Sequence, residues 1–127
     1  STPPKSFREF SQNHLDRAWR NRYNGNSISF LSECNTNSDP SFFSIRNGII
    51  YGVQNHKIIH EKFIEYNNRR ALNSTVTGLV DGIKTKFNII VLKKNNCIYV
   101  LTYVGLDSHF DQNINDFNNF LTGFKAP

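Results

Sequence analysis

The sequence predicts an α+β domain in which a central antiparallel six-stranded sheet is flanked by helices, in the chain order ββ-α-ββββ-α. Three observations lead to this fold class. Six runs are rich in β-branched and aromatic residues, and two further segments carry apolar residues at helical spacing. The dipeptides Asn24-Gly25 and Asp81-Gly82 are typical of the tight turns that join antiparallel strands. A sheet lying between the two helices buries the apolar stripe of each.

The first fourteen residues differ in character from the rest of the chain. Residues 1–14 are expected to form an N-terminal tether or lead-in, and residues 15–127 a single α+β domain. Pro3-Pro4 disfavours regular hydrogen-bonded structure near the start. Two phenylalanines in this segment can still dock on the domain.

The next elements are two strands and a helix. The strands are expected at residues 17–22 and 27–33, on either side of the Asn-Gly turn. Pro40 then suits the first turn of a helix. We expect this helix to span about fourteen residues, because apolar side chains recur at helical spacing: Phe42, Ile45, Ile49 and Val53.

The second half of the chain reads as four strands and a closing helix. The strands are expected at residues 57–68, 70–80, 83–94 and 97–105. The last two are apolar on both faces, so they are expected to be central in the sheet and covered on both sides. The closing helix carries a second stripe: Phe110, Ile114, Phe117 and Leu121.

The composition permits several partners. The net charge of +5 and the pI of about 9.4 favour attraction to phosphate, either in nucleic acid or in anionic lipid. The basic residues are scattered, however, which is also typical of an ordinary solvated surface. The chain contains no methionine. We therefore expect that residues were removed ahead of Ser1, as a secretory signal, as a lipoprotein leader or by trimming.

Three stretches carry a resemblance to known proteins: AWRNRYNGNSISFLSEC, NNCIYVLTYVG and the phenylalanine spacing from Phe110 to Phe124. The chain resembles the Mog1/PsbP-like fold and, more closely, a group of small uncharacterised bacterial envelope proteins. The resemblance implies a non-catalytic protein of the periplasm, or one anchored at the outer membrane. It would bind a protein partner, such as a membrane transport complex linked to outer-membrane lipid. The alternative is a carrier or sensor of a small apolar ligand such as a lipid.

The two cysteines are expected to form a disulfide. Cys34 ends one predicted strand and Cys97 begins another, and in antiparallel neighbours these ends lie at the same edge of the sheet. The bond would close a loop of about 64 residues. In the chain-entropy model it would raise the free energy of unfolding by at most about 4 kcal/mol. The alternative is a pair of buried, unrelated thiols.

Four residues are candidates for a binding surface: Trp19, Arg20, Tyr99 and Tyr103. Trp19 is flanked by arginines, and an aromatic ring beside cations can stack on bases or contact another ligand. The alternative is that the rings pack in the core, with the tyrosine hydroxyls at its rim. We expect no nucleic-acid partner.

No catalytic or metal site is expected. A small basic nuclease needs a general acid, a general base and a cation around one phosphate. The chain has residues of these types: His14, His56, His60 and His109, with Lys57 or Lys84. Their spacing in the sequence does not indicate that they converge on one site. A spacing of four between His56 and His60 would hold zinc on a helix, whereas on a strand the rings lie about 13 Å apart. Without a nucleophile motif or a phosphate-binding loop, we expect neither an enzyme nor a cofactor.

Overall fold

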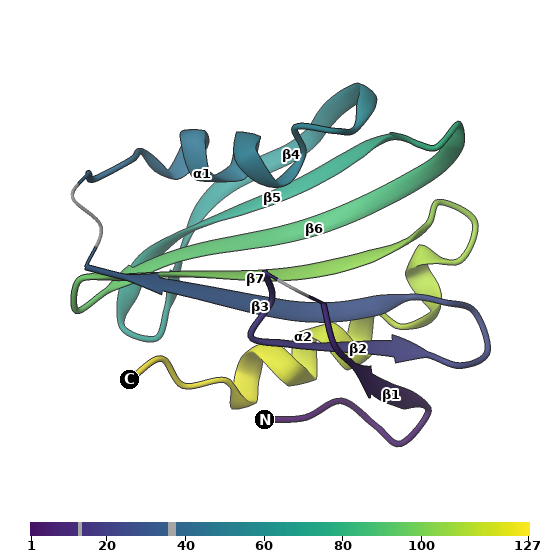
Figure 1. The fold of residues 1–127 in the computed structure, drawn as a ribbon, viewed down its shortest axis with the longest axis horizontal. Helices are drawn as coiled ribbons and strands as arrows, with labels where there is room; N and C mark the ends of the chain where they lie inside the picture. Colours follow the sequence, from purple (N-terminus) through teal and green to yellow (C-terminus); the bar gives the residue numbers. More distant parts are fainter. Residues whose placement is uncertain (13, 36–37) are drawn as a thin grey trace.

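A single antiparallel sheet of seven strands lies between two helices (Figure 1). The computed structural model describes residues 1–12, 14–35 and 38–127, so residue 13 of the expected tether lies outside it. The strands are β1 (Phe7–Phe10), β2 (Arg17–Asn21), β3 (Ser27–Cys34), β4 (Gln54–Tyr66), β5 (Arg69–Val80), β6 (Ile83–Lys94) and β7 (Cys97–Leu106). The helices are α1 (Phe42–Ile49) and α2 (Ile114–Gly123), and a short 3-10 helix, η1 (Phe110–Gln112), precedes α2.

The spatial order of the strands is β1-β2-β3-β7-β6-β5-β4. Every neighbouring pair is antiparallel, and most pairs follow one another in the chain. The exception is the pairing of β3 with β7, which joins the N-terminal strands to the rest of the sheet. The α+β class is confirmed, with β6 and β7 near the centre of the sheet.

The predicted count of six strands is wrong, because residues 7–10 form an additional edge strand. Phe7 pairs with Asn21 and Phe10 with Ala18. The backbone N–H of Phe7 donates to the carbonyl of Pro4 at 2.9 Å, so residues 4–7 form the turn that leads into β1. Four residues are too few to show a period of two in the sequence.

Both helices are shorter than their apolar stripes. The Ser41 hydroxyl caps α1 by accepting the N–H of Ser44 at 3.0 Å, and the helix spans only eight residues. Val53 continues the helical spacing but lies beyond the helix end, where the chain turns back to enter β4. Phe110 likewise belongs to η1 rather than to α2.

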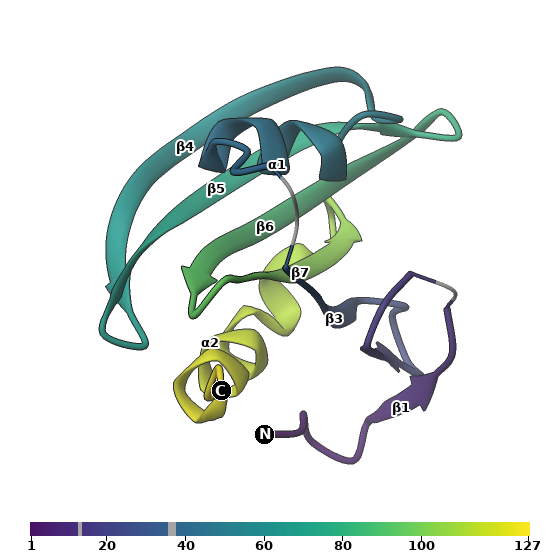
Figure 2. The ribbon, with the colours of Figure 1, turned by 60° about the vertical axis from the view of Figure 1, so that its left-hand side comes forward.

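Each helix covers one face of the sheet and closes one of two apolar cores (Figure 2). On the face covered by α2, aromatic rings of the helix pack on β3, β6 and β7: Phe117, Phe120, Phe124, Ile28, Ile90, Leu101 and Tyr103. On the other face, α1 packs over β5 and β6. The uncovered part of the α1 face, over β3 and β7, is where the candidate site lies.

Candidate binding groove

A groove runs along the sheet between α1 and the connection from β1 to β2. Its floor is the α1-facing side of β3 and β7, which α1 leaves open because it packs over β5 and β6. On β3 the side chains that alternate towards this face are small or polar except for one leucine, and on β7 they are mostly apolar: Ser27, Ser29, Leu31, Glu33, Val100, Thr102 and Val104.

The walls come from parts of the chain that are distant in sequence. Gly48 and Ile49 of α1 form one wall, and the opposite wall is formed by the β1–β2 connection: Phe10, Gln12, His14 and Leu15. Two cavities of about 370 Å³ each lie along the groove and share lining residues from the α1 wall and the floor, namely Gly48, Ile49, Leu31 and Val100. Such volumes are within the range of small-ligand and peptide pockets. We therefore treat them as one site, defined as the α1 groove.

The two ends of the α1 groove carry opposite charges. Arg20 lies at one end, where it pairs with Ser27 across β2 and β3 and stacks 4.7 Å from the Phe10 ring centroid. Glu33 lies at the other end of the groove, six residues after Ser27 along β3. At about 3.3 Å per residue the two ends are about 20 Å apart. Because both side chains are exposed, each is available to an occupant.

The α1 wall is held in place by polar contacts, most of them partly buried. Arg46 of α1 forms two hydrogen bonds with the Glu61 carboxylate of β4, at 3.0 and 3.1 Å. The Ser74 hydroxyl donates to the same carboxylate at 2.6 Å. Ahead of the helix, Lys93 Nζ donates to the Asp39 carboxylate at 3.0 Å and also to the Pro40 carbonyl. A wall fixed at both ends gives the groove a preformed shape, which lowers the entropic cost of binding.

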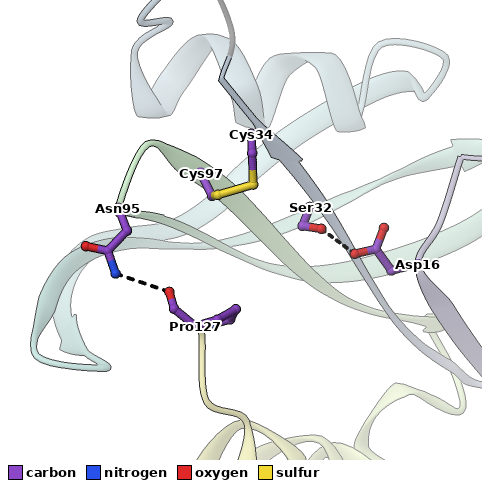
Figure 3. The surroundings of a disulfide bond; sticks show 6 residues. All are labelled: Asp16, Ser32, Cys34, Asn95, Cys97 and Pro127. Carbon is purple, nitrogen blue, oxygen red and sulfur yellow. Dashed lines mark hydrogen bonds between the residues drawn. A yellow bond between two sulfur atoms is a disulfide. The ribbon is translucent and has the colours of Figure 1, made fainter.

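A disulfide joins the two floor strands at the Glu33 end, on the α2 side of the sheet (Figure 3). Cys34 and Cys97 are directly opposite each other in the β3–β7 pair, with a Cα–Cα distance of 4.0 Å and an S–S distance of 2.01 Å. Nearby, the Ser32 hydroxyl donates to the Asp16 carboxylate, and Asn95 Nδ2 donates to the Pro127 carbonyl at 3.2 Å. The covalent link holds β3 and β7 in one register.

The structure does not bring the predicted binding residues together on one surface. Trp19, Tyr99 and Tyr103 have only 4%, 5% and 0% of their surface exposed, and they pack under α2. The Trp19 and Phe120 rings meet edge to face at 5.5 Å. Arg20 projects from the opposite face of the sheet, into the α1 groove. Of these four residues, only Arg20 belongs to the candidate site.

The four histidines of the nuclease alternative do not converge on one site. His14 lines the α1 groove, His56 and His60 are exposed on the edge strand β4, and His109 precedes η1. Among the described residues, no group of three or more His, Cys, Asp or Glu side chains is arranged to hold a metal ion. Lys84 lies 3.5 Å from the Asp107 carboxylate, in an ion pair.

The α1 groove was not predicted from the sequence. The sequence feature that marks the groove is the pair of small residues Ser27 and Ser29, which lie on one face of a strand that carries Ile28 and Phe30 on the other. Such a face is normally read as solvent-exposed. Only the three-dimensional arrangement shows that α1 and the β1–β2 connection enclose it on both sides.

Comparison with known proteins supports the fold and adds little at the level of sequence. No protein-family model and no curated protein sequence matches the chain. The chain is similar in structure to the cyanobacterial PsbP protein, CyanoP, of Synechocystis (TM-score 0.68, 8% identity, 98% of this chain and 84% of that chain covered). It is also similar to a protein of unknown function from Pseudomonas aeruginosa (TM-score 0.66, 8% identity, 100% and 85% covered).

A third similar structure is LpqN of Mycobacterium tuberculosis, described as involved in cell envelope biogenesis (TM-score 0.65, 11% identity, 94% and 77% covered). The chain therefore has a PsbP-like fold, and the expected resemblance to envelope proteins of this fold is confirmed. In the part of the chain that the structure describes, no helix has the length and apolar character needed to span a membrane.

Proposed function

We propose that this domain is a non-catalytic binding module of the bacterial cell envelope, and that the α1 groove binds an apolar segment of a protein partner. The observation that carries the proposal is the groove itself: a preformed trough whose floor is apolar at its centre, around Leu31 and Val100, with a charge of opposite sign at each end. Similar structures add support, since none of the three is described as an enzyme.

The geometry defines the kind of segment that fits. A groove of about 20 Å accommodates about six residues of extended chain. Leu31, Ile49 and Val100 favour apolar side chains in the middle of that segment. Arg20 favours an acidic residue at one end, and Glu33 favours a basic residue at the other. Such complementarity sets the direction in which the segment lies.

Location in the envelope is part of the proposal. A disulfide persists in oxidising compartments such as the periplasm, and LpqN, a protein of the same fold, is described as involved in envelope biogenesis. On this basis the domain acts in the periplasm or at the outer membrane. There it would serve as an accessory to a membrane transport complex.

A peptide-display selection tests the function. The enriched peptides are expected to carry an apolar centre with an acidic and a basic residue at opposite ends. Gly48 has no neighbouring atom within 4 Å of a Cβ, so Gly48→Leu fills the groove without disturbing the helix. This variant is expected to lose binding of the enriched peptides by at least tenfold. Asn119→Leu, on the exposed side of α2, adds the same side chain outside the groove and is the matched control.

Two outcomes would contradict the proposal. In the first, the selection enriches no common pattern. In the second, the enriched peptides bind the Gly48→Leu variant as tightly as the unmodified chain. Either result would remove the groove as the binding site. Circular dichroism of both variants checks that the fold is retained.

The second candidate is a carrier of a small apolar ligand, because the same floor and volume fit an acyl chain. Native mass spectrometry of gently purified protein distinguishes the two. A bound lipid that is absent from the Gly48→Leu variant would favour the carrier over the peptide-binding module.

A further inference from the structure

We infer that the face of the sheet opposite the α1 groove binds an anionic phospholipid surface. α2 packs mainly against β7, so the distal part of β4, β5 and β6 on the α2 side is left uncovered (Figure 2). Five basic side chains project from this area, which we define as the basic face: Lys57, His60, Lys62, Lys84 and Lys86.

The strand register places these residues in adjacent rows. Across β4, β5 and β6, the first row is Lys57–Thr77–Lys86, the second is His60–Thr75–Asn88, and the third begins with Lys62 and Asn73. The side on which they lie is fixed by contacts. Lys86 Nζ lies 4.9 Å from the centroid of the Phe110 ring, and Ile64, two residues after Lys62, packs in the α2-side core. The pairing register of β4, β5 and β6 thus brings these basic side chains together on one face of the sheet.

The charges of the basic face are not balanced by acidic residues within it. The structure describes β4, β5 and β6 completely, and none of their α2-side positions holds Asp or Glu. The two carboxylates of β4, Glu61 and Glu65, stand on the α1 side, where Glu61 is bound by Arg46. Among these four lysines and one histidine, only Lys84 has an ion pair between described residues, with Asp107 at 3.5 Å.

The chemistry of the face fits lipid phosphate better than nucleic acid. Single-stranded nucleic acid is held by stacking of bases on exposed aromatic rings. The α2-side positions of this area carry no Phe, Tyr or Trp ring, and Phe110 lies buried beneath Lys86. Instead, lysines act as point charges around a strip of hydroxyl and amide groups, including Asn73, Thr75 and Thr77, that can hydrogen-bond phosphate. β4 is an edge strand, so its lysines can approach a flat surface.

Vesicle co-sedimentation tests the inference. The chain is expected to sediment with mixed phosphatidylglycerol–phosphatidylcholine vesicles and not with pure phosphatidylcholine vesicles. Binding should be lost at about 0.5 M salt, because screening shortens the range of the attraction. Each lysine near an anionic membrane strengthens binding about fivefold. Lys57→Gln/Lys62→Gln is therefore expected to weaken binding more than tenfold.

The control variant removes the same charge elsewhere. Lys5→Gln/Arg8→Gln lowers the net charge equally at the opposite edge of the sheet, in and before β1, and is expected to bind nearly as well as the unmodified chain. Equal loss in both variants would show a general charge effect and overturn the inference. So would vesicle binding that survives Lys57→Gln/Lys62→Gln, or binding to RNA without binding to anionic vesicles. The basic face and the α1 groove lie on opposite faces of the sheet. The proposal of lipid binding can therefore be wrong while that of groove binding is right, and the reverse.

Discussion

Gly105 shows how one position in this fold depends on having no side chain. A Cβ at Gly105 would lie 2.3 Å from Asn26 Oδ1, far inside normal contact. Asn26 cannot easily give way, because its side chain is buried and Nδ2 donates to the Tyr103 hydroxyl at 3.1 Å and to the His109 carbonyl at 2.9 Å. This amide helps to tie the β2–β3 turn to the segment before α2.

Gly105→Ala is expected to lower the free energy of unfolding by about 2 kcal/mol, because the added methyl group must displace the buried amide. Urea denaturation followed by circular dichroism measures the change. The matched control is Gly48→Ala, where a Cβ meets open space. That change is expected to leave stability the same or to raise it by up to about 1 kcal/mol, since alanine favours the helix. Equal effects at the two glycines would contradict this account.

At the scale of elements, the β3–β7 pair holds the two parts of the sheet together, and the disulfide lies at its end. The two cysteines are 63 residues apart in sequence, so the bond greatly restricts the unfolded chain. Cys34→Ser/Cys97→Ser is therefore expected to lose about 2–4 kcal/mol of unfolding free energy.

Urea unfolding of the unmodified chain with and without reductant checks this loss by a second route, because reduction should reproduce the effect of the serines. A double variant as stable as the unmodified chain would mean that the bond contributes nothing to the fold. Peptide mapping without reductant would first establish that the Cys34–Cys97 bond is formed.

The elements that the sequence predicted well are those with long, uninterrupted patterns. Residues 83–94 were expected as a strand and form β6 with the same bounds, because the apolar run is flanked by turns on both sides. The predictions failed where the pattern was short or accidental. β1 has only four residues, and Val53 lies at helical spacing although the chain has already left the helix. Its burial comes from packing against the sheet, which local spacing cannot distinguish from a helical stripe.

At the scale of the whole molecule, the sequence showed which residues are apolar but not which face each helix covers. Trp19, Tyr99 and Tyr103 were candidates for a surface because nothing local shows that α2 lies over them. The α1 groove was not predicted, since its walls and floor come from segments that meet only in the folded chain. The basic face has the same origin: lysines that are scattered in sequence become neighbours through strand register.

Two tyrosines join the α2 region to the sheet, and they make stability depend on alkaline pH. The Tyr66 hydroxyl donates to the Leu121 carbonyl at 2.7 Å, and the Tyr103 hydroxyl donates to the Phe110 carbonyl at 2.5 Å. Burial raises the pKa of Tyr66 and that of Tyr103 to about 12, from a usual value of about 10. The unfolded chain therefore releases these protons at lower pH than the folded chain does.

The free energy of unfolding is expected to be unaffected by these groups below pH 10 and to fall as the pH rises from about 10 to about 12. Urea denaturation across this range measures the slope. Tyr66→Phe should make the slope shallower. Tyr51→Phe should leave it unchanged, because Tyr51 is 92% exposed. A slope that does not respond to Tyr66→Phe would contradict the assignment.

The single long-range junction in the sheet has a consequence for how the chain folds. Strands β4 to β7 are successive hairpins with local contacts, so they can form early and at low entropic cost. β3 must wait until β7 exists, because its pairing closes a loop of more than sixty residues. During synthesis the N-terminal strands emerge first and yet complete the sheet last. Their unpaired edges are therefore exposed to other chains until β7 has left the ribosome.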